Sequence, residues 1–181
     1  MCLQFLCLRC LTFTSLPPWI NPSLLPDLSN LSLSLQVLRQ ADMEILGRLR
    51  MLRRIGIHDT LLFRKLRFCT MATTSIRFVP PPAAVTTPVS VMPYLELLHF
   101  SLDVHFFKDR KIAFDIGLEH LPSSLRTVKV FVLCHLAKEE DVKEAEAALL
   151  HSVSIHPSRP ALQLERLAED KMLPSHLKDD Q

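Results

Sequence analysis

The chain has 181 residues, of which 48% are hydrophobic and 22% charged, so it is long enough to bury the core of one domain. Its net charge of +2 gives no argument for binding nucleic acid or an anionic membrane. The three glycines are not clustered, so the chain offers no glycine-rich loop for a nucleotide phosphate.

The N-terminal segment, residues 1–15, is apolar but lacks the features of a membrane or targeting segment. Arg9 interrupts it, no small-residue cleavage site follows, and it is far shorter than the ~20 residues that a spanning helix needs. We interpret it as the remnant of an upstream repeat. The five cysteines form no disulfide framework, which favours a reducing, cytoplasmic setting. We expect Cys7 and Cys10 to be buried as small apolar residues.

From residue 16 onward one apolar phrase recurs, Leu-x-x-Leu-x-x-Leu-x-Leu, with aliphatic or aromatic replacements. Its first positions bring the chain round a turn, and its last two alternate along a short strand. The inward pairs that it predicts are Leu31 with Leu33, Ile55 with Ile57, Leu98 with Phe100, and Val128 with Val130. One strand cannot bury its apolar face alone, so successive units must stack. The pattern is typical of a leucine-rich-repeat solenoid, an α/β fold with a curved parallel sheet and short irregular or helical returns.

The spacing of the phrases places the irregular repeats in residues 16–136. Positions equivalent to Leu31 follow at intervals of 24, 43 and 30 residues, against ~20–29 residues for a repeat of this kind. The long interval has room for a degenerate unit at Ile76 and Phe78. Residues 36–46 predict a helical return between two phrases.

The pattern changes after residue 136. Residues 138–152 predict a helix, because acidic residues at its start favour the positive end of the helix dipole and an apolar stripe follows one face. That stripe consists of Val142, Ala145, Leu149 and Val153. Residues 161–167 alternate as a strand. We therefore assign residues 137–167 to a C-terminal cap of helix and strand and expect residues 168–181 to form a disordered tail.

The chain contains no recognised motif for enzymatic chemistry, a metal or a cofactor. Asp103 and His105 have the spacing of neighbours on one strand face, but such a pair is more often a surface pair than a site. Cys134 and His135 would face opposite sides of a strand. We therefore expect no catalytic residue, no metal and no cofactor.

A basic stretch lies within the repeats. It comprises Arg48, Arg50, Arg53, Arg54, Arg64, Lys65 and Arg67. These side chains could form a patch for an acidic partner. The alternative is that they are solvated flanks of the repeat strands, which is the usual role of a run of charges.

The residues that alternate with the inward pairs should point to the other face of the sheet, which we take as the candidate protein-binding face. They are Asn30, Ser32, Ser34, Arg54, His58, Leu97, His99, Ser101, Thr127, Lys129 and Phe131. Outward-pointing Leu97 and Phe131 are unusual for a merely solvated surface. The alternative, a face that is simply exposed sheet, stays open.

Five segments carry a family resemblance: LPPWINP at 16–22, LPDLSNL at 25–31, LRQADMEILGRL at 38–49, GLEHLP at 117–122 and IHPSRP at 155–160. Together they resemble the C-terminal leucine-rich repeats of plant NB-ARC–leucine-rich-repeat disease-resistance proteins, especially those of cereals. The coiled-coil and nucleotide-binding domains of such receptors have no counterpart in this chain.

The resemblance implies a non-enzymatic protein-recognition module of intracellular innate immunity, here in truncated form. Its partner would be a protein: a pathogen effector, a guarded host protein, or a nucleotide-binding module supplied in trans. Neither nucleic acid nor a membrane span is expected. Two alternatives stay open, a generic leucine-rich-repeat adaptor or scaffold and a non-functional fragment that does not fold alone.

Overall fold

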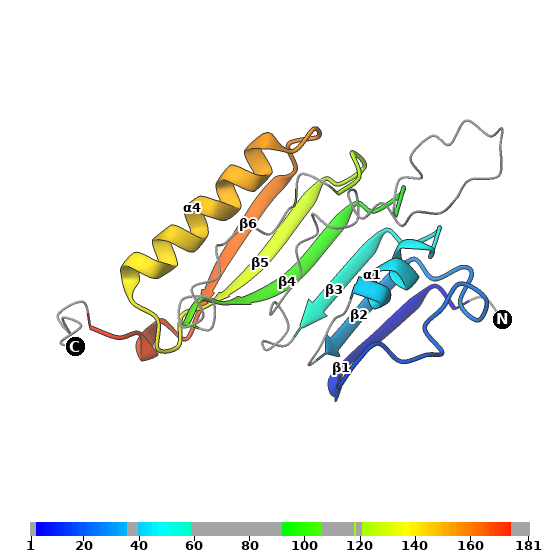
Figure 1. The fold of residues 1–181 in the computed structure, drawn as a ribbon, viewed down its shortest axis with the longest axis horizontal. Coiled ribbons are helices and arrows are strands. Elements are labelled where there is room, and N and C mark those ends of the chain that lie inside the picture. Colours follow the sequence, from blue (N-terminus) through cyan, green and yellow to red (C-terminus); the bar gives the residue numbers. More distant parts are fainter. Residues whose placement is uncertain (1–2, 36–39, 59–91, 106–117, 119–120, 175–181) are drawn as a thin grey trace, which may run out of the picture.

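The computed structural model describes residues 3–35, 40–58, 92–105, 118 and 121–174. In this part of the chain, strands β1 to β6 form one parallel sheet in which the spatial order of the strands follows the chain (Figure 1). The strands are β1 (Phe5–Phe13), β2 (Asn30–Leu35), β3 (Arg54–His58), β4 (Leu97–Asp103), β5 (Thr127–Leu133) and β6 (Ala161–Leu167). The helices are α1 (Gln40–Gly47), α4 (Glu139–Ile155) and the short 3-10 helix η3 (Glu169–Lys171).

The repeated apolar phrase sets the register of the sheet. Leu31, Ile55, Leu98 and Val128 pair from strand to strand, and so do Leu33, Ile57, Phe100 and Val130. All eight side chains are at most 3% exposed. Because side chains alternate at period two, a slip of one residue would expose a whole row. The predicted inward pairs and their alignment on neighbouring parallel strands are therefore confirmed.

The same two rows continue into the outer strands. Leu6 and Leu8 on β1 pair with the equivalent residues of β2, and Leu162 and Leu164 on β6 pair with those of β5. These four side chains are half-buried and pack against the core. The apolar ridge therefore spans all the described strands.

A ladder of shared carbonyls joins the turns that precede the strands. In each turn one carbonyl oxygen accepts hydrogen bonds from two consecutive N–H groups of the next turn, at 2.8–3.0 Å. The carbonyls of Gln4, Ser29, Arg53 and Glu96 each bind two such N–H groups. A carbonyl oxygen has two lone pairs, so it can accept from two backbone N–H groups. These N–H groups, at the start of each strand, are therefore satisfied by the preceding turn.

Helix α4 packs on the ridge side of the sheet. Val142, Ala145, Leu149 and Val153 are buried in the same core as the strand rows, as the sequence predicts. Figure 1 shows α4 running beside β6. Arg166, on β6, fixes the helix by donating from Nε and Nη2 to the two carboxylate oxygens of Glu146 at 2.7 and 2.8 Å.

A second group of polar contacts lies in the turn between α4 and β6. His156 is 1% exposed. Its Nδ1 accepts a hydrogen bond from the backbone N–H of Ser158 at 3.1 Å, so its Nε2 carries the proton and donates to the carbonyl of Leu121 at 3.1 Å. The Ser158 hydroxyl donates to the carbonyl of Leu125 at 2.7 Å. The IHPSRP segment therefore ties the end of α4 to the turn before β5.

Some expectations differ from the structure. Cys7 and Cys10 are exposed, not buried, because Cys7 lies on the face opposite the ridge and Cys10 lies where the β1–β2 register shifts, between Leu8 and Thr12. Asp103 and His105 do not share a strand face, since β4 ends at Asp103.

The predicted disordered tail is structured where it is described. Residues 169–171 form η3, and the N–H of Leu173 donates to the carbonyl of Ala137 at 2.9 Å. Residues 175–181 lie outside the described part, as do residues 36–39 of the predicted helical return and the proposed unit at Ile76 and Phe78. The parallel sheet is confirmed, whereas its curvature as a solenoid, the cap and the segment limits at 15, 136 and 167 stay predictions.

Candidate protein-binding face

The predicted face residues form a regular grid on the side of the sheet opposite the ridge, which we call the outer face. Its first row contains Asn30, Arg54, Leu97 and Thr127, and its second contains Ser32, Gly56, His99 and Lys129. The third contains the pairs Ser34 with His58 and Ser101 with Phe131. The sheet therefore brings together all the residues that the sequence places on this face.

The outer face is less exposed than the alternation suggests. Ser34, His99 and Ser101 are buried, with exposures of 6%, 9% and 7%. The hydroxyl of Ser34 donates to the carbonyl of Arg9 at 3.2 Å, so it is turned toward β1. His99 lies between two other rings, those of His58 and Phe131.

Gly56 lies in the middle of this grid. It has neighbours on both adjoining strands, Ser32 and His99, and no side chain of its own. A Cβ at this position would lie only 3.0 Å from Ser32 Oγ and 3.2 Å from His58 Nε2. A glycine inside a strand commonly marks a close approach of another group, and here the approaching groups are Ser32 and His58, whose side chains contact each other at 3.2 Å. Gly56 also lines a cavity of about 210 Å³.

We call this space the outer-face cavity. It is lined by Phe5, Cys7, Arg9, Asn30, Leu31, Ser32, Arg54, Ile55, Gly56, Leu97 and His99. Arg9 donates from Nε to Ser32 Oγ at 2.9 Å, which holds its guanidinium over the second row. The lining combines two arginines with apolar and hydroxyl groups.

A row of rings borders the cavity. The centroids of His58 and His99 are 4.6 Å apart, with an interplanar angle of 88°. Those of His99 and Phe131 are 4.7 Å apart, at 68°, so both contacts are edge-to-face. Lys129 Nζ lies 4.9 Å from the Phe131 centroid and 3.2 Å from a carboxylate oxygen of Glu165. The ring contacts and this ion pair therefore link side chains of the second and third rows.

The histidines on this face are held neutral. Burial, together with the charges of His99 and Arg9, lowers the pKa of His58 to about 4. Burial also lowers the pKa of His99, with Arg9 and Lys129 adding to the effect and Glu165 opposing it. At neutral pH each ring therefore carries one N–H donor and one acceptor.

His99 carries a polar atom without a partner. Among the residues that the structure describes, its buried Nε2 makes no hydrogen bond. Such an atom normally finds a partner when it is buried. The atom belongs to a residue that lines the outer-face cavity.

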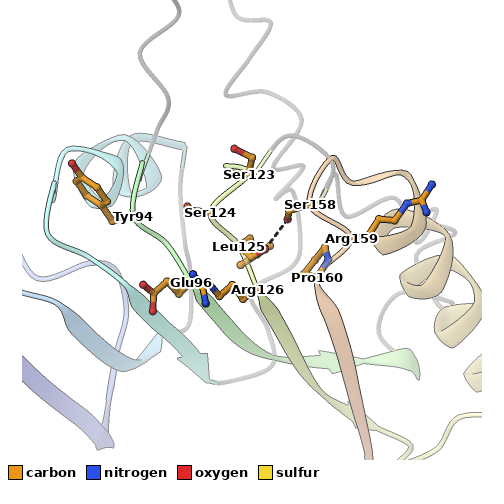
Figure 2. Close-up of a pocket in the computed structure, with 9 residues that line it drawn as sticks. All are labelled: Tyr94, Glu96, Ser123, Ser124, Leu125, Arg126, Ser158, Arg159 and Pro160. Atoms are coloured by element: carbon orange, nitrogen blue, oxygen red, sulfur yellow. Dashed lines mark hydrogen bonds between the residues drawn. The ribbon is translucent and has the colours of Figure 1, made fainter.

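A second cavity, of about 380 Å³, lies where β4, β5 and β6 begin (Figure 2). Figure 2 shows Tyr94 and Arg159 at its opposite ends, with Glu96 and Arg126 between them. Two of its three serines already serve the fold. Ser124 donates to the carbonyl of Leu95 at 2.9 Å, and Ser158 donates to that of Leu125.

The basic stretch is divided by the structure. Arg48 and Arg50 are exposed in the turns around α1 and β3, and Arg53 contacts Glu96 at 3.4 Å. Of these residues, Arg54 lines the outer-face cavity. The other three, Arg64, Lys65 and Arg67, lie outside the described residues.

Reasoning from the sequence missed three residues of the site: Phe5, Cys7 and Arg9. All three lie on β1, which pairs with β2 so that Phe5 faces Asn30 and Cys7 faces Ser32. The alternation of Ile55 and Ile57 places Gly56 on the outer face, and the register of the sheet agrees.

One strand for each unit, consecutive strand order and a shared apolar ridge define a parallel repeat protein. A comparison with family models matches residues 1–162 to the leucine-rich repeat region family. The chain therefore belongs to the leucine-rich repeat region family. A comparison with curated proteins finds no match. Leucine-rich repeats are generally non-enzymatic modules of protein–protein interaction, which indicates a protein partner for this chain.

Two further observations concern the described residues alone. They contain no group of three or more His, Cys, Asp and Glu side chains placed to hold a metal ion. Their helices are too short or too polar to cross a membrane.

Proposed function

We propose that this chain is the protein-recognition module of a plant intracellular immune receptor, in truncated form, and that it binds its partner with the outer face. Three observations support the proposal. The chain belongs to a family of interaction modules. Its outer face presents aromatic, histidine and arginine side chains in aligned rows. Its segments at 16–49 and 117–160 resemble those of cereal disease-resistance proteins.

The observation that carries the proposal is the row of rings beside the cavity. The ring of His99 contacts those of His58 and Phe131 edge-to-face. These side chains therefore have little conformational freedom left to lose when a partner docks. Aromatic side chains and arginine are the types enriched at the energetic centres of protein interfaces. The partner is then an effector, a guarded host protein or a nucleotide-binding module in the cytoplasm.

Binding to a separately expressed nucleotide-binding module of a cereal receptor tests this directly, by size-exclusion chromatography of the full chain with that module. We expect a complex that Phe131→Ala weakens by about thirtyfold or more, which corresponds to the loss of about 2 kcal/mol that defines an interface hot spot. Tyr94→Ala, at an exposed aromatic outside the outer face, is the matched control and leaves the complex intact. The same assay, with an effector or a guarded host protein in place of the nucleotide-binding module, tests the other two kinds of partner.

A complex that is equally strong with Phe131→Ala and with the unmodified chain contradicts the use of the outer face. Binding to a ubiquitin-ligase component, with none to immune proteins, favours the adaptor alternative. A melting curve by circular dichroism without a cooperative transition identifies a fragment that does not fold alone.

A further inference from the structure

We propose that the outer-face cavity receives the carboxylate of an aspartate or glutamate side chain from the partner protein. The inference rests on the proposed function, since it takes the partner to be a protein. It adds the chemistry of the contact: an acidic side chain inserted over Gly56, between Arg9, Arg54 and His99.

The size of the cavity selects a side chain. Its volume of about 210 Å³ is below the ~300–1,000 Å³ of pockets for drug-sized ligands. Gly56 lines it without a side chain of its own, and a Cβ there would crowd Ser32 and His58. A single protruding side chain of a docked protein fits such a hollow, whereas a nucleotide or a similar cofactor does not.

The charge of the lining selects an anion. Arg54 makes no ion pair with any residue that the structure describes, and Arg9 uses Nε for Ser32 and leaves its Nη groups without a described partner. The lining contains no aspartate or glutamate. The nearby Glu165 is already paired with Lys129. Two guanidinium groups around one hollow are suited to a carboxylate, which accepts paired N–H donors from arginine.

The ring of His99 belongs to the same lining. Its Nε2 is buried and has no hydrogen-bond partner among the described residues. With the ring neutral, the tautomer that protonates Nε2 can donate to an inserted oxygen once the ring turns this atom toward the cavity. A carboxylate that draws the ring round in this way satisfies an atom that has no partner among the described residues.

Apolar side chains fit the rest of the inserted residue. Phe5 and Leu97 also line the cavity, and Phe5 is 65% exposed. Their carbon atoms would contact the methylene groups of an aspartate or glutamate while the carboxylate reaches the donors. The lining thus matches both ends of an acidic side chain.

A pair of blocked tripeptides tests the proposal on the full chain. N-acetyl-Gly-Glu-Gly-amide is the probe, and N-acetyl-Gly-Gln-Gly-amide is its neutral twin. Binding is followed through the NMR resonances of the histidine rings, with His99 assigned from His99→Phe. We expect the glutamate peptide to shift the His99 signals in a saturable way. Its affinity should be at least about tenfold higher than that of the glutamine peptide, because hydrogen bonds to a charged carboxylate are stronger than those to a neutral amide.

Matched variants separate the cavity from general surface charge. Arg54→Gln should weaken binding about tenfold, whereas Arg50→Gln makes the same change of charge at an exposed turn residue and should have little effect. Gly56→Ala should also weaken binding, because its methyl group narrows the cavity. Circular dichroism verifies that each variant folds.

Equal losses with Arg54→Gln and Arg50→Gln would overturn the proposal, as would equal binding of the two peptides or the absence of saturable binding. The outcomes are distinct from those for the proposed function. If a protein partner binds the outer face but the glutamate peptide does not bind, only the carboxylate site is refuted. If the glutamate peptide binds but no immune protein does, the site stands and the proposed function falls.

Discussion

The ring of His99 stands edge-on against the ring of His58, with 4.6 Å between the two centroids. The two imidazoles come from strands whose sequences are about forty residues apart, and only the parallel register places them side by side. Both are held neutral by burial and by neighbouring positive charge. This pair makes the stability of the outer face sensitive to pH.

Acidification should destabilise the fold through His58. Its folded pKa of about 4 lies below the ordinary histidine pKa of 6.5, so the unfolded chain binds more protons between these values. The free energy of unfolding therefore falls as the pH is lowered from 7 toward 4. Thermal melting at pH 7 and pH 5 should show a smaller decrease in Tm for His58→Gln than for the unmodified chain.

His151→Gln is the control for this experiment, because His151 is exposed on α4. It should leave the pH dependence of the Tm unchanged. If His58→Gln and the unmodified chain lose the same Tm between the two pH values, His58 is not the source of the effect.

Replacing His99 by phenylalanine should stabilise the protein. The substitution removes the buried Nε2 that has no described partner and keeps a ring against His58 and Phe131. An unsatisfied buried polar group costs about 1–3 kcal/mol, so we expect the free energy of unfolding to rise by about 1 kcal/mol in urea denaturation. His58→Phe should instead lower it, since His58 Nε2 contacts Ser32 Oγ at 3.2 Å. A loss of stability in His99→Phe would mean that the ring is already satisfied.

Truncation of Phe100 should be among the most damaging changes to the ridge. This side chain is 1% exposed and belongs to the largest fully buried residues. Phe100→Ala creates a cavity in the stacked rows, and we expect it to lower the free energy of unfolding by about 3–5 kcal/mol. Tyr94→Ala, at a residue 55% exposed, should change it by no more than about 0.5 kcal/mol. Similar effects of the two variants would contradict the assigned register.

Arg166→Lys should loosen α4 from β6. The guanidinium binds Glu146 through two parallel hydrogen bonds and also reaches Glu139 at 3.3 Å. Lysine cannot reproduce this fork, so we expect a loss of about 1–2 kcal/mol, measured by chemical denaturation. Lys143→Arg, at an exposed i,i+4 pair with Glu139, is the control and should be nearly neutral.

The same contact has a pH signature. Arg166 holds the pKa of Glu146 below its ordinary value. A carboxyl group with a depressed folded pKa contributes stability above its unfolded pKa and loses it as the pH falls through the folded value. The difference in stability between the unmodified chain and Arg166→Lys should therefore shrink below about pH 4.5. A difference that is constant with pH would exclude this ion pair as its origin.

The ridge could be predicted from the sequence because its signal is local. Leu31 with Leu33 and Ile57 with Ile55 alternate at the strand period, and identical phrases must occupy equivalent places in neighbouring units. The stripe on α4 could be predicted for the same reason, from spacing within one helix. Each of these inferences needs only residues that are close in the sequence.

The outer-face cavity could not be predicted in this way. Arg9, Gly56 and His99 are far apart in the sequence, and they meet only because β1, β3 and β4 take a particular register. The β1–β2 register also shifts between Leu8 and Thr12, which no repeat phrase indicates. Which residues meet across the strands depends on the register of each strand pair. The face on which a residue lies depends on alternation along its own strand alone.

The pleat separates two tasks within each strand. In β2, Ser32 and Ser34 lie on the outer face, and Leu31 and Leu33 lie on the ridge side. A substitution on the outer face therefore leaves the side chains of the ridge unchanged. If the outer face binds a partner, as we propose, its specificity can change one position at a time while the architecture stays constant.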